Sequence, residues 1–196
     1  EAVALSMGPP LAGVELYFTT STDFATMDTS GMYQILNDEV NWDDGAFNHV
    51  KASLGPFDLG WGTYKNSKNR VYGSRVFAFK LRNGSYKKLL IDSLRNGIYS
   101  FTYADLDGSN EKSVSIDKSD YSGKTLAYYS LEADSALDLE PTSWDMKFCR
   151  YATPLNAGMG DTVSYMVTGV LTNAGVEIAQ ADGIDPMTVD YQNYST

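Results

Sequence analysis

Cysteine and histidine are nearly absent from this chain, whose 196 residues include one of each, Cys149 and His49. A single cysteine excludes an intramolecular disulfide, and a structural zinc site needs several such ligands. Catalytic triads usually need a histidine base, and the sequence has no Gly-x-Ser-x-Gly, P-loop or Gly-x-Gly-x-x-Gly motif. We therefore expect a protein that is not an enzyme, with Cys149 as a small strand residue.

Long apolar runs and excess positive charge are missing as well. No run reaches the length of a membrane span, and 25 acidic against 15 basic residues give a formal charge of −10. Such a surface repels phosphate, so neither nucleic acid nor an anionic membrane is an expected partner. The first residues lack the features of a signal peptide. We expect a single domain over residues 1–196, or a piece of a longer exported protein.

The residues that are abundant favour β structure. Tyrosine occurs 14 times, and no amphipathic helix of three turns is evident. Asn83-Gly84 and Asn96-Gly97 predict two type I′ turns, in which both central residues have positive φ. They would join strands at 74–81, 86–91 and 98–103 into a β-meander. The predicted fold class is all-β, mostly antiparallel, with little helix.

Other segments are assigned from their local pattern. Further strands are expected within 1–18 and at 114–116, 126–131, 144–151 and 163–170. Residues 19–48 are predicted to be irregular with a helical turn near 33–36, and 176–181 to be a short strand or a helical turn. Residues 55–73 combine glycines with aromatic side chains, which indicates a loop packed by its own rings or the wall of a pocket.

An acidic loop follows the meander. In Asp105-Leu106-Asp107-Gly108-Ser109-Asn110-Glu111, oxygen ligands stand at alternate positions around a glycine, as at the start of a calcium loop. The candidate calcium ligands are Asp105, Asp107, Ser109 and Glu111. The third Asp/Asn and the distant bidentate Glu of an EF-hand are absent, and a plain acidic turn explains the pattern equally well.

Two segments together resemble the HmuY-like family over roughly half the chain. The segment 144–156 (WDMKFCRYATPLN) is similar to that family's Trp-Asp-apolar-x-apolar-x-Arg-Tyr…Leu-Asn pattern. The residues of 63–65, 75–80, 83–84, 88 and 98–103 resemble its Tyr-Lys, Arg-Val-Phe and Thr-Phe-Thr-Tyr hairpins. The resemblance implies an all-β lipoprotein on the outer surface of a Gram-negative bacterium, which captures haem between two β-hairpins through two axial His or Met side chains.

The haem ligands are not fixed by that resemblance, because no His or Met stands in the stretch before Tyr64. One histidine excludes bis-histidine ligation, so the candidate axial ligands are His49, Met27, Met32, Met159 and Met166; core filling is the alternative for the methionines. The leading prediction is an extracellular or cell-surface binding module with haem as its nameable ligand. The first alternative is a structural or adhesive domain that binds other protein chains through 55–73. The second is a carbohydrate-binding module with Trp42, Trp61 and the tyrosines as stacking platforms.

Three Asp-Ser/Thr-apolar triplets gain a meaning from the same resemblance. Bacteria that make HmuY-like proteins commonly attach O-glycans at such triplets, so Ser93, Ser135 and Thr162 are candidate glycosylation sites. A glycan must stay in solvent, and we expect Ser135 and Ser93 to be exposed. Chance occurrence of three short triplets is the alternative.

Overall fold

The computed structural model of this chain describes residues 14–36, 45–48, 54–158, 161–173, 175–180, 182–185 and 187–188. Within that part the protein is mostly antiparallel β-sheet, and no helix reaches seven residues. The helical pieces described are 3₁₀ turns: η2 (Ala46–Asn48), η3 (Asn66–Lys68) and η4 (Lys118–Tyr121). The all-β prediction is confirmed. Among the described helices, none combines the length and apolar character needed to cross a bilayer.

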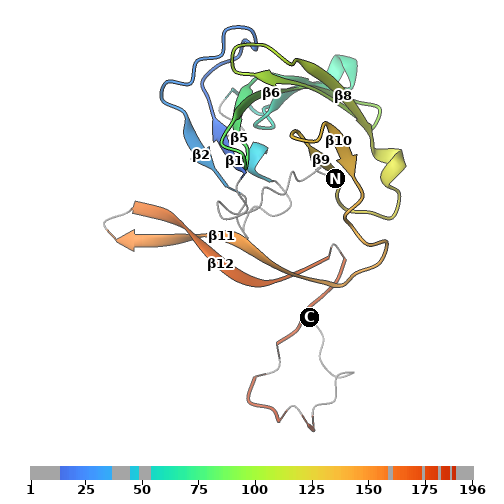
Figure 1. The fold of residues 1–196 in the computed structure, drawn as a ribbon. Helices are drawn as coiled ribbons and strands as arrows, with labels where there is room; N and C mark the ends of the chain where they lie inside the picture. The colour runs from blue at the N-terminus through green and yellow to red at the C-terminus, as the bar shows by residue number, and fades with distance from the viewer. Residues whose placement is uncertain are drawn as a thin grey trace.

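Eight strands form one curved sheet, which we call the body (Figure 1). They are β1 (Glu15–Phe18), β2 (Tyr33–Ile35), β3 (Gly62–Lys65), β4 (Arg70–Gly73), β5 (Val76–Lys80), β6 (Tyr86–Arg95), β7 (Ile98–Asp105) and β8 (Lys112–Asp117). Strand β6 is central: β7 pairs along one of its edges, and β5 and then β4 pair along the other. The predicted meander is confirmed as β5, β6 and β7.

The two Asn-Gly turns differ. Asn96 and Gly97 both have positive φ, 51° and 81°, as a type I′ turn requires. At the first turn Gly84 has a φ of 82° and Asn83 is not among the positive-φ residues. The Gly84 N–H donates to the Leu81 carbonyl at 2.9 Å and the Leu81 N–H donates to the Ser85 carbonyl at 2.8 Å. This loop is a type I turn followed by a left-handed glycine, so the type I′ prediction is wrong there.

The core lies on the inner face of the curve. Phe77 and Phe79 of β5 and Phe101 and Tyr103 of β7 are buried there. Phe47 of η2 packs edge-on against Phe77, with ring centroids 4.7 Å apart. A second small sheet, β9 (Tyr128–Ser130) and β10 (Ser135–Leu137), lies within the curve (Figure 1) and places Tyr129 edge-on to Phe101 at 5.2 Å.

The outer face of β5 is covered by the loop between β1 and β2. The Val76 N–H donates to the Ser21 carbonyl at 2.9 Å, and Phe24 lies over the buried Lys88 ammonium, with Nζ 4.7 Å from the ring centroid. The loop then continues into β2 and not into the predicted helical turn at 33–36. That prediction is wrong because Ile35 pairs with Leu16 of β1, which holds the backbone extended.

The glycine-rich stretch 55–73 contains the β3–β4 hairpin, which the sequence did not predict. A Cβ at Gly73 would lie 2.0 Å from the Ile91 carbonyl oxygen, so β4 approaches β6 closely because no side chain is present. The rings do pack locally: Phe57 lies 6.4 Å from Tyr64, and buried Trp61 lies 6.1 Å from Tyr99. The expectation of a segment packed by its own rings is confirmed only in part, because Trp61 packs against a different strand.

A buried ion pair fixes the kink between β4 and β5. Arg75 donates to Asp58 through both terminal nitrogens, at 2.8 and 2.7 Å, and also to the Gly60 carbonyl. Asp58 further accepts from the Leu54 and Gly60 N–H groups, each at 2.9 Å. The hydrogen bonds from Arg75 hold the pKa of Asp58 far below its usual value. The loop 54–61 is thereby tied to the sheet.

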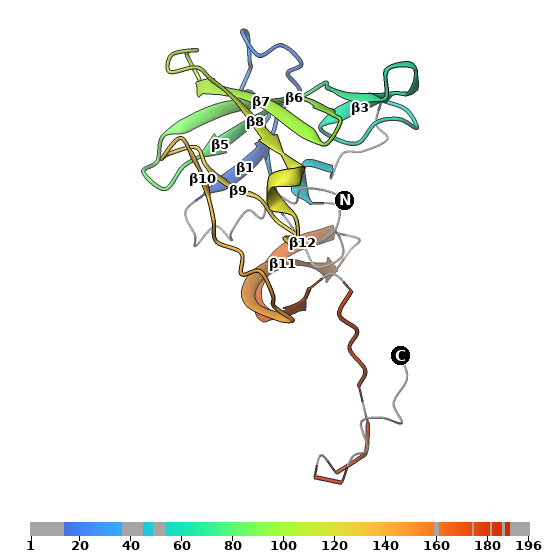
Figure 2. The same cartoon turned by 90° about the vertical axis from the view of Figure 1, so that its right-hand side faces the viewer.

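The last two strands form a hairpin apart from the body (Figures 1 and 2). They are β11 (Met146–Gly158) and β12 (Asp161–Thr172), the longest strands described. The strands predicted at 144–151 and 163–170 are confirmed, although β11 begins two residues later and ends further along the chain, and β12 extends beyond the prediction at both ends. Residues 176–180, expected to be a short strand or a helical turn, are neither.

Candidate functional site

None of the residues of the β11–β12 hairpin whose side chains are described is buried. Its ladder runs from Met146↔Thr172 to Gly158↔Asp161, with an irregularity after Asn156. Within the described residues neither strand pairs with any other strand. No third described strand therefore lies along either outer edge of the hairpin, and an edge of this kind is able to pair with a strand of another chain.

Both faces of the hairpin carry exposed apolar side chains. Directly paired residues of an antiparallel ladder share a face, so Phe148 and Val170 lie together on one face, with Met146 next to them. Phe148 is 77% exposed. Cys149, opposite Gly169, lies on the other face and is half-buried. We call the exposed apolar residues the hairpin surface: Met146, Phe148, Leu155, Tyr165 and Val170.

A polar network attaches the base of the hairpin to the preceding chain. The buried Glu140 carboxylate accepts from the Trp144 indole N–H at 2.8 Å and from the Leu126 N–H at 2.6 Å. Asn173 donates to the Trp144 carbonyl at 2.9 Å. Burial raises the pKa of Glu140, but the hydrogen bonds outweigh it and the pKa lies below its usual value. Trp144 of the Trp-Asp motif is therefore held in place by hydrogen bonds just before β11 begins at Met146.

The chain beyond the hairpin is also exposed. Among the described residues of 175–188, Glu177, Asp182 and Asp185 are exposed, and Met187 is 90% exposed. The described residues lead away from the body (Figure 2). The sequence of 175–188 places acidic and apolar residues among small ones and contains no lysine or arginine.

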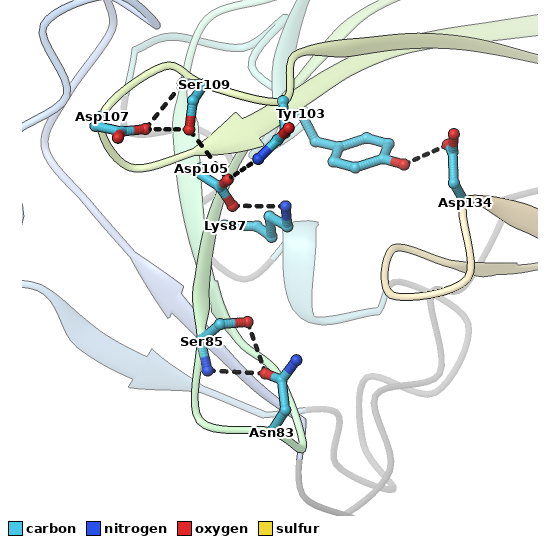
Figure 3. Close-up of polar contacts among 9 residues, drawn as sticks. Asn83, Ser85, Lys87, Tyr103, Asp105, Asp107, Ser109 and Asp134 are labelled. Carbon is cyan, nitrogen blue, oxygen red and sulfur yellow. Dashed lines mark hydrogen bonds and ion pairs between the residues drawn. The ribbon is translucent and has the colours of Figure 1, made fainter.

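The predicted calcium loop is held together by its own side chains (Figure 3). The Lys87 ammonium lies 2.6 Å from the Asp105 carboxylate and is the main cause of the lowered pKa of Asp105. The Ser109 hydroxyl donates to Asp107 at 2.7 Å, and Glu111 is exposed. No cluster of three His, Cys, Asp or Glu residues able to hold a metal occurs in the part of the chain that is described. The acidic-turn alternative accounts for this geometry, and calcium binding stays a prediction.

The three glycosylation candidates lie in different surroundings. Ser93 is 3% exposed and accepts a hydrogen bond from Arg70 Nη2 at 2.8 Å, so the expectation that it is exposed is wrong. Ser135 begins β10 and is half-buried. Thr162 belongs to β12, but its side chain lies outside the described set. Glycosylation at Ser135 and Thr162 stays a prediction.

Asp134, which precedes Ser135, joins the β9–β10 hairpin to the body (Figure 3). It has a φ of 51°. Its carboxylate accepts from the hydroxyls of Tyr103 and Tyr129, the latter at 2.7 Å, and lies 3.1 Å from the Lys112 ammonium. These bonds, that from Tyr103 foremost, lower the pKa of Asp134 to about 2. The sequence held no sign of the contact with the body, because Tyr103 lies 31 residues before Asp134 in the chain.

The candidate haem ligands are not brought together among the described residues. His49 and Met159 lie outside the described residues. Met27 and Met32 belong to the loop between β1 and β2 in the body, whereas Met166 lies on β12. Haem binding by any of these side chains stays a prediction.

Comparisons with protein-family models, with curated proteins and with solved structures found no match to this chain. The resemblance to the HmuY-like family therefore stays a prediction, and the candidate site rests on its own geometry.

Proposed function

We propose that this chain is a structural protein-interaction domain that associates with copies of itself through the β11–β12 hairpin. The observation that carries the proposal is the exposure of Phe148, 77%, on a 13-residue strand that, within the described residues, pairs with β12 alone. The location on a bacterial surface that the family resemblance implies is part of the same proposal.

The physical argument starts from the weakness of an isolated hairpin. Two strands without a third layer are at best marginally stable in water. Exposed apolar patches on a soluble chain commonly mark contact sites, and open strand edges pair readily with other chains. A partner chain that covers the hairpin surface and adds a strand to its sheet would stabilise the hairpin, bury its exposed apolar side chains and pair its edges.

Charge favours a second copy as that partner. Residues 146–172 contain Lys147 and Arg150 against the single acid Asp161, whereas the whole chain has a formal charge of −10. Two copies that each carry −10 repel one another overall, but the weakly basic hairpin is a part of the surface to which a second acidic copy is attracted. Steering of this kind acts on the rate of encounter, and the apolar side chains then supply the affinity.

Sedimentation velocity of the purified chain over a wide concentration range tests the proposal. We expect the average sedimentation coefficient to rise with concentration, and Phe148→Ser to weaken association by about tenfold or more, as for a buried interface anchor. The matched control is Phe57→Ser, since Phe57 is also largely exposed, at 57%, but belongs to the body. A wild-type chain that stays monomeric at every concentration, or equal effects of the two variants, would overturn the proposal.

A further inference from the structure

Positive charge is concentrated in one part of this acidic chain. Residues 65–95 hold nine of the 15 lysines and arginines and one acid, Asp92, whereas residues 1–50 and 151–196 hold no lysine or arginine. Several of the nine have carboxylate partners in the structure: Arg75 with Asp58, Lys80 with Glu15 and Lys87 with Asp105.

Three of the remaining cations form a line across neighbouring strands, which we call the basic row: Lys65, Arg70 and Arg95. Lys65 of β3 is directly opposite Arg70 of β4. Since Val71 is opposite Leu94, the next step of the same register sets Arg70 beside Arg95 at the end of β6. Val71 is buried, so the row lies on the outer face, and Lys65 and Arg95 are exposed.

The row is electrostatically unfavourable as it stands. Side chains directly opposite in an antiparallel pair have Cβ atoms ~5 Å apart, and like charges there are destabilising. Among the described residues neither Lys65 nor Arg95 has an ion-pair partner. Asp117 of β8, opposite Ile98, lies two strands beyond Arg95, and its carboxylate accepts from the Ser119 N–H at 2.9 Å.

Arg70 adds a second sign of an incomplete site. Its Nη2 donates to the neutral Ser93 hydroxyl at 2.8 Å, and its guanidinium carbon lies 4.7 Å from the centroid of the Tyr72 ring. Its Nε is buried and has no hydrogen-bond partner among the residues that the structure describes. An arginine oriented in this way, between two further cations, is suited to a carboxylate from outside the sheet.

We propose that the basic row binds the acidic segment 175–188 of a second copy. The segment contains no lysine or arginine, and it supplies the exposed acids Asp182 and Asp185. Its described residues lie away from the body, where a neighbouring molecule can reach them (Figure 2). This inference deepens the proposed function: a contact between two different surfaces is head-to-tail, and such contacts build open chains when they do not close into a ring.

The test measures binding of a fluorescent, end-capped peptide of residues 175–188 to the full-length chain by anisotropy. We expect saturable binding at low salt that weakens as salt is raised, because exposed charges are screened beyond ~10 Å at about 0.1 M salt. Arg95→Glu should weaken binding about tenfold, since it removes one attraction and adds a repulsion. The matched control is Arg82→Glu, the same change at an exposed arginine in the turn at the other end of β6.

Charge exchange gives the decisive arm. A peptide carrying the single change Asp185→Lys should bind the wild-type chain more weakly and regain affinity with the Arg95→Glu chain, since one charge of each partner is then exchanged. Absence of peptide binding, equal effects of Arg95→Glu and Arg82→Glu, or no rescue by charge exchange would each overturn the inference. The peptide measurement does not depend on the sedimentation result with Phe148→Ser. Association through the hairpin can fail while the peptide binds, and the peptide can fail to bind while the hairpin associates.

Discussion

The body and the β11–β12 hairpin are built from the same kind of strand but differ in what covers them. Strand β5 is buried on both faces, by the core on one side and by the loop 19–32 on the other. Strand β11 has exposed apolar side chains on both faces. Each strand is paired along its length with at least one neighbouring strand. Such pairing alone does not decide which strands belong to a stable core, because the layers on either face do.

The largest expected difference between the body and the hairpin is in the stability lost when a phenylalanine of each is replaced by alanine. Phe77 in β5 is 0% exposed and Phe148 in β11 is 77% exposed. Phe77→Ala should lower the free energy of unfolding by about 3–5 kcal/mol, because it removes buried area and leaves a cavity. Phe148→Ala should change it by less than about 0.5 kcal/mol in dilute solution. Urea unfolding followed by tryptophan fluorescence measures both, and similar losses would show that the hairpin is covered within one molecule.

The next largest expected effect is the loss of stability when the buried ion pair Asp58–Arg75 is broken. Asp58→Asn leaves the Arg75 guanidinium buried without its counter-charge and should cost about 3 kcal/mol or more. The comparison is Glu15→Gln, which removes the partner of Lys80 in a partly exposed pair and should cost less than about 1 kcal/mol. Thermal unfolding of the two variants at neutral pH separates them. Equal shifts of the melting temperature would contradict the assigned role of the buried pair.

The smallest expected effect concerns the attachment of β9–β10 by Asp134. Its pKa of about 2 in the folded chain lies below the value of about 3.9 for an unfolded aspartate. The stabilisation is therefore present above about pH 4 and is lost as the pH falls towards about 2. Melting temperatures measured over this range should fall less steeply for Asp134→Asn than for the wild-type chain. Parallel curves would show that another group causes the acid sensitivity.

Local turn chemistry predicted the centre of the fold. Asn96-Gly97 gave the correct turn type because β6 and β7 are joined by two residues, whereas Asn83-Gly84 stands in a three-residue loop between β5 and β6. The dipeptide indicates a hairpin in both cases, but the turn type depends on loop length. The loop length did not follow from the dipeptide, because the mixed residues on either side of it, Leu81-Arg82 and Ser85-Tyr86, do not mark where each strand ends.

Contacts between distant segments were beyond sequence reasoning. Strand β2 is extended because β1 lies beside it, and Ser93 is buried because Arg70 and the β4 strand cover it. The candidate site was missed for a related reason. Apolar side chains alternate in residues 144–151 as they do in a core strand, and nothing in that pattern says whether a second layer is present.

The lone cysteine has a practical consequence that follows from its position. Cys149 is the single thiol of the chain and is half-buried on β11. A thiol-reactive fluorophore or spin label would therefore mark every molecule once, within the hairpin and nowhere else. The environment and mobility of that label would report directly on the hairpin of an otherwise unmodified protein, and dipolar coupling between labels would measure how far apart the hairpins of two molecules lie.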